Sequence, residues 1–125
     1  MSKMISVDFQ GEFVSSDGRW ANPGKSVHFI EGTLIPFFRE HQLRVFEIIS
    51  DYRQPRPGDS GDGCYPGTPG YESKIPSDVK SGDIWVKCMN SPIWTRENIG
   101  KANAEPGLPY QDPDQFTEWL LRTVG

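Results

Sequence analysis

The first segment of the chain alternates between apolar and polar residues. Every second position from 5 to 10 is apolar, and these positions are Ile5, Val7 and Phe9. Successive side chains of a strand point to opposite faces of a sheet, so this alternation predicts a half-buried strand. Further short strands are expected at residues 12–14, 19–21 and 26–30, with a hairpin turn at Asp17-Gly18.

Two helices are predicted by apolar residues that recur with the period of an α-helix. The apolar residues Leu34, Phe37 and Phe38 fall on one face together with His41, which predicts a short helix over 33–42. A C-terminal helix is expected over 113–124, where Asp112 would cap the first turn and Pro113 would occupy the first helical position. Its apolar stripe is formed by Phe116, Trp119, Leu120 and Val124.

The order of these elements predicts the fold class. Apolar, β-branched and aromatic residues indicate two more strands, at 43–51 and 84–89. Because the strands come early and the helices do not alternate regularly with them, the order argues against a doubly wound parallel sheet. We therefore expect an α+β fold with a mainly antiparallel, bent or barrel-like sheet of five or six strands, on which the short helix and the C-terminal helix pack. The length of 125 residues predicts a single domain over residues 1–125.

Residues 54–82 form a long stretch in which both periodic patterns are lost. The stretch holds five prolines and six glycines, which predicts a loop. A loop of this length in a compact domain is usually either functional or disordered. Three tyrosines in or beside it, at positions 52, 65 and 71, favour an ordered excursion over a solvated linker.

Composition and charge narrow the class of protein. The 13 glycines and 11 prolines argue against a helical bundle, because these residues are the poorest in helix interiors. The net charge of −4 argues against a nucleic-acid binder, which usually carries a basic surface for phosphate. No apolar run reaches the roughly 18 residues of a membrane span. The first residues lack the apolar core of a secretory signal, so the expected location is the cytoplasm.

Cysteine and histidine are the candidates for reactive chemistry. Cys64 and Cys88 lack further ligands at zinc spacing, so no metal site and no cofactor are predicted. Two free thiols are the favoured interpretation, with a disulfide or a nucleophilic Cys64 as alternatives. His28 and His41 are expected as neutral side chains at the edge of the core, or as general bases where distant groups converge on them.

The aromatic content and the long loop favour a binding function. Tryptophan and tyrosine, of which the chain has four each, are the residue types most enriched at binding hot spots. We expect a non-enzymatic protein-binding module, such as a small acidic inhibitor, immunity or accessory protein, that contacts a protein partner through the loop. The candidate partner-binding residues are Arg53, Arg56, Tyr65, Tyr71 and Trp85. The alternative is a small hydrolase or nuclease that uses His28 or His41 with carboxylates, and the sequence leaves the oligomeric state open.

Overall fold

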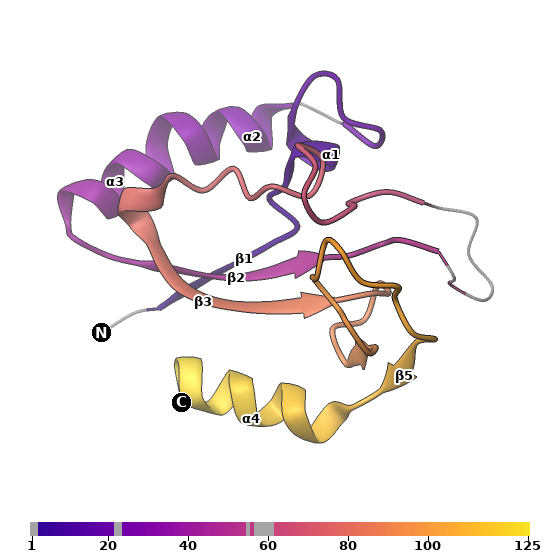
Figure 1. Cartoon of the computed structure of the whole chain (residues 1–125). Helices are drawn as coiled ribbons and strands as arrows, with labels where there is room; N and C mark the ends of the chain where they lie inside the picture. Colours follow the sequence, from indigo (N-terminus) through magenta and orange to yellow (C-terminus); the bar gives the residue numbers. More distant parts are fainter. Residues whose placement is uncertain (1–2, 22–23, 55, 57–61) are drawn as a thin grey trace.

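A three-stranded parallel sheet lies at the centre of the molecule, with helices on both sides of it (Figure 1). The computed structural model describes residues 3–21, 24–54, 56 and 62–125. The strands are β1 (Met4–Val7), β2 (Val45–Ser50) and β3 (Lys80–Lys87), and β2 is the central one. A second, antiparallel pair consists of β4 (Trp94–Thr95) and β5 (Tyr110–Gln111). The fold is therefore α+β.

A long helix connects β1 to β2 and covers one face of the sheet (Figure 1). It consists of α2 (Lys25–Phe29), a π-helical turn (Ile30–Leu34) and α3 (Ile35–Glu40), which follow one another directly. A short helix, α1 (Gly11–Val14), precedes it. The core between this helix and the sheet consists of Phe9, Ile35, Phe38, Val45, Ile75 and Val79.

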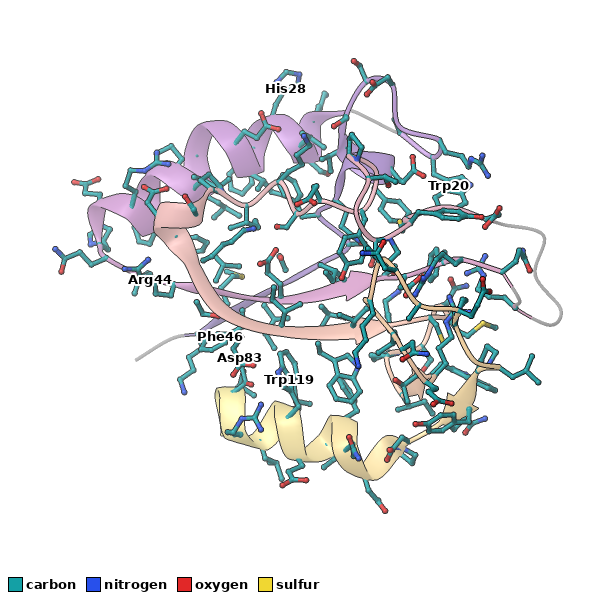
Figure 2. The ribbon with its side chains drawn as sticks, in the orientation of Figure 1. Trp20, His28, Arg44, Phe46, Asp83 and Trp119 are labelled. Atoms are coloured by element: carbon teal, nitrogen blue, oxygen red, sulfur yellow. The ribbon has the colours of Figure 1, made fainter. Side chains whose placement is uncertain are left out.

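The C-terminal helix α4 (Pro113–Val124) lies on the opposite side of the sheet (Figures 1 and 2). The Asp112 carboxylate accepts a hydrogen bond from the Gln115 N–H (3.1 Å), so the predicted cap and helix are confirmed. The Trp119 indole N–H donates to Asp83 Oδ1 of β3 (2.8 Å), and its ring lies 6.1 Å from that of Trp85. Burial of Trp119 anchors α4 on the sheet.

The expectation of a mainly antiparallel, bent or barrel-like sheet of five or six strands is wrong. Residues 26–30, expected as a strand, lie in the long helix, and the helix expected at 33–42 is the second half of it. The β1–helix–β2 unit makes a parallel neighbour pair, in which Met4 lies beside Val45 and Val7 beside Ile48. A parallel pair needs such a crossover connection, because a tight turn can join only antiparallel strands.

The predicted loop at 54–82 ends earlier than expected. A 3-10 turn (Ser77–Val79) leads directly into β3, so residues 80–82 belong to the strand. Gly82 has a φ of 85° in the part of β3 where its register against β2 shifts, which identifies a bulge. The described part of the loop is joined to the fold by bridges between Tyr52 and Gly63 and between Gln10 and Ser73. Residues 55 and 57–61 of this loop lie outside the described residues.

No helix within the described part of the chain combines the length and the apolar character needed to cross a bilayer.

Candidate functional site

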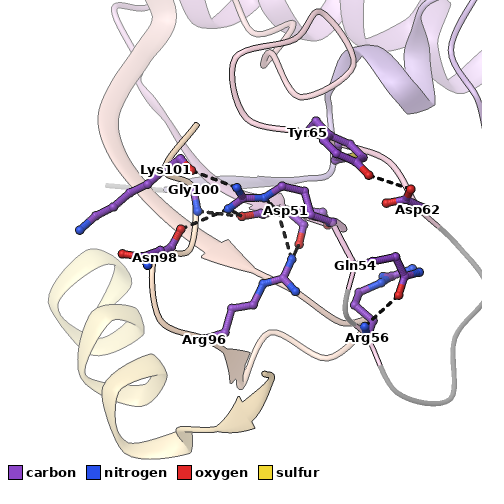
Figure 3. Close-up of polar contacts among 12 residues, drawn as sticks. Asp51, Gln54, Arg56, Asp62, Tyr65, Arg96, Asn98, Gly100 and Lys101 are labelled. Atoms are coloured by element: carbon purple, nitrogen blue, oxygen red, sulfur yellow. Dashed lines mark hydrogen bonds and ion pairs between the residues drawn. The ribbon is translucent and has the colours of Figure 1, made fainter. Parts of the chain in front are cut away.

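A buried carboxylate lies directly after the central strand. Asp51 directly follows β2, and its carboxylate accepts hydrogen bonds from Arg53 Nε (2.9 Å) and Nη2 (2.7 Å) (Figure 3). It also accepts hydrogen bonds from Arg96 Nη2 (3.2 Å) and from the Gly100 N–H (2.9 Å). Burial by itself would raise the pKa of Asp51, but the hydrogen bonds from Arg53 and Gly100 and the charges of both arginines hold the pKa below its ordinary value. Asp51 is therefore a structural anion that fixes the segments around it.

The remaining donors of Arg53 hold the loop that follows β4. Its Nη1 donates to the carbonyl oxygens of Lys101 (3.1 Å) and Ala104 (3.0 Å), and its Nη2 also donates to that of Asn98 (3.2 Å). All five guanidinium N–H groups are thus used inside the chain. Arg56 is also buried, with its guanidinium carbon 4.2 Å from the centre of the Tyr52 ring.

The other residues expected to bind a partner lie on different parts of the molecule. Tyr65 is 42% exposed and donates its hydroxyl to Asp62 Oδ2 (2.8 Å) (Figure 3). Tyr71 is half-buried, and burial raises its pKa to about 12. Trp85 is half-buried on the side of the sheet that faces α4, where its indole N–H donates to the Pro92 carbonyl (2.8 Å).

Two of those five residues line the same cavity. Arg53 and Tyr65 lie at a hollow of about 410 Å³, together with Gln54 and residues 102–106. The structure does not bring Arg56, Tyr71 or Trp85 to this hollow. Arg53 contributes no spare donor, so among the described residues that line the hollow there is no guanidinium group available to pair with an acidic partner.

A second polar cluster joins the carboxyl ends of all three parallel strands. Lys87 Nζ donates to Ser50 Oγ (2.8 Å), to the Tyr52 hydroxyl (2.7 Å) and to the Met89 carbonyl (3.2 Å). It also forms an ion pair with Asp8 Oδ2 (3.3 Å), just past β1. The ammonium is buried and fully supplied with oxygen partners, so this cluster ties strands together rather than presenting a reactive amine.

The cysteines and histidines are not arranged as catalytic pairs. Both cysteines are free and fully buried, and burial together with nearby Glu12 raises the pKa of Cys64 to about 12. A thiol with such a pKa stays protonated and non-nucleophilic at neutral pH. His28 points outward from α2 (Figure 2), and the ring of His41 lies 4.3 Å from that of Phe37. Within the described ranges, neither imidazole has a carboxylate or thiol in hydrogen-bond reach, and no three potential metal ligands cluster.

An apolar groove runs beside β1, and we call it the β1 groove. It consists of two adjoining cavities of about 240 and 230 Å³ that share Met4, Leu34 and Phe38. The larger cavity is also lined by Ile5, Ser6, Val7, Phe9, Ile30, Ile35, Val45 and Ile75. The smaller cavity is completed by Lys3, Phe37, Leu43 and Arg44. The sequence pattern did not indicate a groove at these residues.

The outer edge of β1 is an unpaired strand edge in the described structure. The sheet order places β1 at one side, where it pairs only with β2. The Asp8 N–H donates to the Ile48 carbonyl of β2 (2.9 Å), and backbone groups alternate in direction along a strand, so those of Ile5 and Val7 point away from β2. Val7 is 58% exposed and Met4 39%. The groove thus offers backbone donors and acceptors next to apolar walls.

Comparison with protein-family models, with curated proteins and with solved structures finds no match to this chain.

Proposed function

We propose that this protein is a protein-binding module that takes up an extended segment of its partner in the β1 groove. The observation that carries the proposal is an exposed strand edge that runs along an apolar groove. An extended peptide can add to such an edge through main-chain hydrogen bonds, while alternate side chains enter neighbouring pockets. The two adjoining hollows would receive such side chains.

The arrangement of the groove favours a peptide over a small ligand. The groove consists of two adjoining hollows of about 240 and 230 Å³, and each suits a single apolar side chain. The hollows lie along a strand edge, as the pockets for alternate side chains of an added strand do. An apolar small molecule cannot form hydrogen bonds with the unpaired backbone N–H and C=O groups of the β1 edge, whereas an added strand can.

The loop surface expected from the sequence supports the proposal less well. Arg53 and Arg56 are buried within the chain, which leaves Tyr65 as the exposed member of the predicted set. Contact with a partner through Tyr65 stays a prediction. The hydrolase or nuclease alternative needs a carboxylate beside His28 or His41, and no described carboxylate lies in reach of either imidazole.

Selection of peptides on the folded protein tests this function. A random-peptide display library is selected on the wild-type protein, and binding of the enriched peptides is then measured on groove variants. Val7→Pro removes an N–H that points away from β2, and Phe37→Ser removes an exposed ring at the groove. We expect each change to weaken binding roughly tenfold, as the loss of a hydrogen bond or of a buried apolar contact would.

The control variant is Leu121→Ser, which removes a 64% exposed apolar side chain from α4 and should leave binding unchanged. Amide chemical shifts should change at residues 4–7 and 30–38 on addition of a selected peptide. Peptides that bind Val7→Pro and Phe37→Ser normally but fail to bind Tyr65→Ser would move the site to the loop. Absence of any groove-dependent peptide would contradict the proposal.

A further inference from the structure

We infer that Ile75 determines the size of the apolar side chain that the larger hollow of the β1 groove accepts, and that Ser73 and Glu47 hold Ile75 in place. This inference rests on the proposed function and adds the residues that give it specificity. The long loop thereby contributes to recognition from inside the groove.

Ile75 is the loop residue among the described residues that line the larger hollow. The other lining residues belong to β1, to β2 or to the long helix, or follow β1 directly in the case of Phe9. Binding residues often lie on loops that a rigid scaffold positions. Ile75 is 4% exposed and packs in the same cluster as Phe9 and Phe38. One wall of the hollow is therefore formed by a side chain whose place depends on the loop.

Hydrogen bonds on both sides of Ile75 fix the loop at this point. The Lys74 N–H donates to the Phe9 carbonyl (2.8 Å). The Ile75 N–H donates to Ser73 Oγ (3.2 Å), and the Ser73 hydroxyl in turn donates to Glu47 Oε1 of β2. Through Ser73, the backbone of Ile75 is thus tied to the central strand.

Glu47 is well placed to retain Ser73. Its carboxylate is fully buried, and strand alternation puts it on the same face of the sheet as Val45, which lines the hollow. Glu47 Oε2 forms no hydrogen bond within the described part of the chain, so Ser73 is the partner that satisfies this carboxylate there. Loss of that partner would leave a buried charge without a hydrogen bond, which is costly. The Glu47–Ser73 contact therefore holds the wall of the hollow against the sheet.

The two hollows contact different positions of a bound strand. The larger hollow begins at Met4, which it shares with the smaller one, and extends along β1 to Phe9. Ile75 lies at the Phe9 end, because Lys74 bonds to Phe9. Leu43 lines the smaller hollow. Alternate side chains of an added strand enter neighbouring pockets, so Ile75 and Leu43 should each affect a different position of the same peptide.

Enlargement of each hollow in turn tests the inference. Random-peptide display is carried out on wild type, on Ile75→Ala and on the matched variant Leu43→Ala. Selection on Ile75→Ala should replace one apolar residue of the wild-type consensus by a larger one, and selection on Leu43→Ala should change a different position. The enlarged peptide should bind Ile75→Ala roughly tenfold more tightly than it binds wild type, as two further buried methylene groups would give. Ile75→Val truncates the core less and should shift the preference in the same direction.

Variants of Ser73 test how Ile75 is held. The readout is the ratio of affinities for the wild-type peptide and the enlarged peptide, which a general loss of stability does not change. Ser73→Ala should reduce this ratio, Ser73→Thr should restore it, and Thr68→Ala, which removes another loop hydroxyl, should leave it unchanged. The double variant Ser73→Ala, Glu47→Leu removes both polar partners, a change that can be nearly neutral for stability, and should also reduce the ratio.

The outcomes separate the inference from the function on which it rests. Groove-dependent peptides with the same consensus on wild type and on Ile75→Ala would overturn the inference and leave the proposed function standing. An unchanged ratio in both Ser73→Ala and the double variant would overturn the role of Ser73 and Glu47. Absence of groove-dependent peptides would overturn the inference together with the proposed function.

Discussion

Asp51 shows how a single buried charge organises the region around it. Its carboxylate meets Arg53, Arg96 and the Gly100 N–H within 3.2 Å. Asp51→Asn would leave two buried guanidinium groups without their anion, a change that typically costs about 3–5 kcal/mol. We expect a correspondingly large fall in the urea midpoint, whereas exposed Asp17→Asn should leave it unchanged. Equal midpoints for the Asp51 variant and the wild type would show that the arginines are held by other contacts.

The same carboxylate contributes to the dependence of stability on pH. The pKa of Asp51 lies below its ordinary value in the folded state, so ionised Asp51 stabilises the fold above the unfolded pKa of about 4. This contribution is lost as the pH falls through the folded pKa. Wild-type stability should therefore decline on acidification more steeply than that of Asp51→Asn. The free energy of unfolding of both proteins, measured from neutral to acidic pH, tests this expectation.

Cys64 is expected to be unreactive in the folded protein. Its pKa is raised to about 12 by burial and by Glu12, against an unfolded value of about 8.5. Because the folded pKa is higher than the unfolded one, the protonated thiol contributes to the stability of the fold. This contribution is fully present at pH values below the unfolded pKa, and it is lost as the pH rises toward the folded pKa. Ellman's reagent should label neither Cys64 nor buried Cys88 at mildly alkaline pH, and both should react in urea. Rapid labelling without denaturant would mean that the loop around Cys64 opens readily.

At the scale of elements, the long helix carries a glycine, a residue type that is poorly suited to a helix interior. Gly32 lies in the π-helical turn, and a Cβ built on it meets no atom within 4 Å. Gly32→Ala should stabilise the protein by about 0.5–1 kcal/mol, because alanine loses less conformational freedom in a helix. Thermal unfolding measures this gain. Gly18→Ala is the opposite case, because the added Cβ would lie 2.4 Å from the Gly11 carbonyl oxygen. This substitution should therefore destabilise the protein.

The elements that sequence patterns predicted correctly are those with strong local signals. Asp112 and Pro113 mark the start of α4, and the alternation after Ile5 places β1 within a few residues. The long helix was missed because Val27 and Phe29 also fit a strand, and Gly32 interrupts the helical pattern. Ile30, Leu34 and Phe38 form a stripe in the structure because residues 25–40 are one continuous helical segment. The sequence prediction divided this segment into a strand and a short helix, so it could not recognise the stripe. With that crossover helix unseen, a parallel sheet could not be predicted.

The site was less accessible to sequence reasoning than the elements. Arg53 was expected to be an exposed contact, although Asp51 two residues earlier would face the same side of an extended chain and could have signalled an internal pair. The β1 groove joins Lys3 to Arg44 through the register of two parallel strands. No local pattern contains that register, because it depends on the crossover helix.

At the scale of the whole molecule, the exposed edge of β1 is also a liability for aggregation. An unpaired strand edge beside apolar surface can pair with another chain when the fold loosens. Here the strand is short and Lys3 lies at its start, features that limit such pairing without abolishing it. Val7 is 58% exposed and its backbone N–H and C=O point away from β2, so this residue presents both an apolar side chain and unpaired backbone groups at the vulnerable edge.

Val7→Lys should therefore slow aggregation without changing the stability of the fold. An added charge on a strand edge opposes pairing with a second apolar strand, while an exposed side chain contributes little to packing. Light scattering at a fixed temperature just below the melting midpoint measures the aggregation rate, and calorimetry measures the midpoint. Leu121→Lys places the same charge on exposed α4 and serves as the matched control. Slower aggregation with Val7→Lys alone identifies β1 as the template, whereas an equal effect of both variants would attribute the change to net charge.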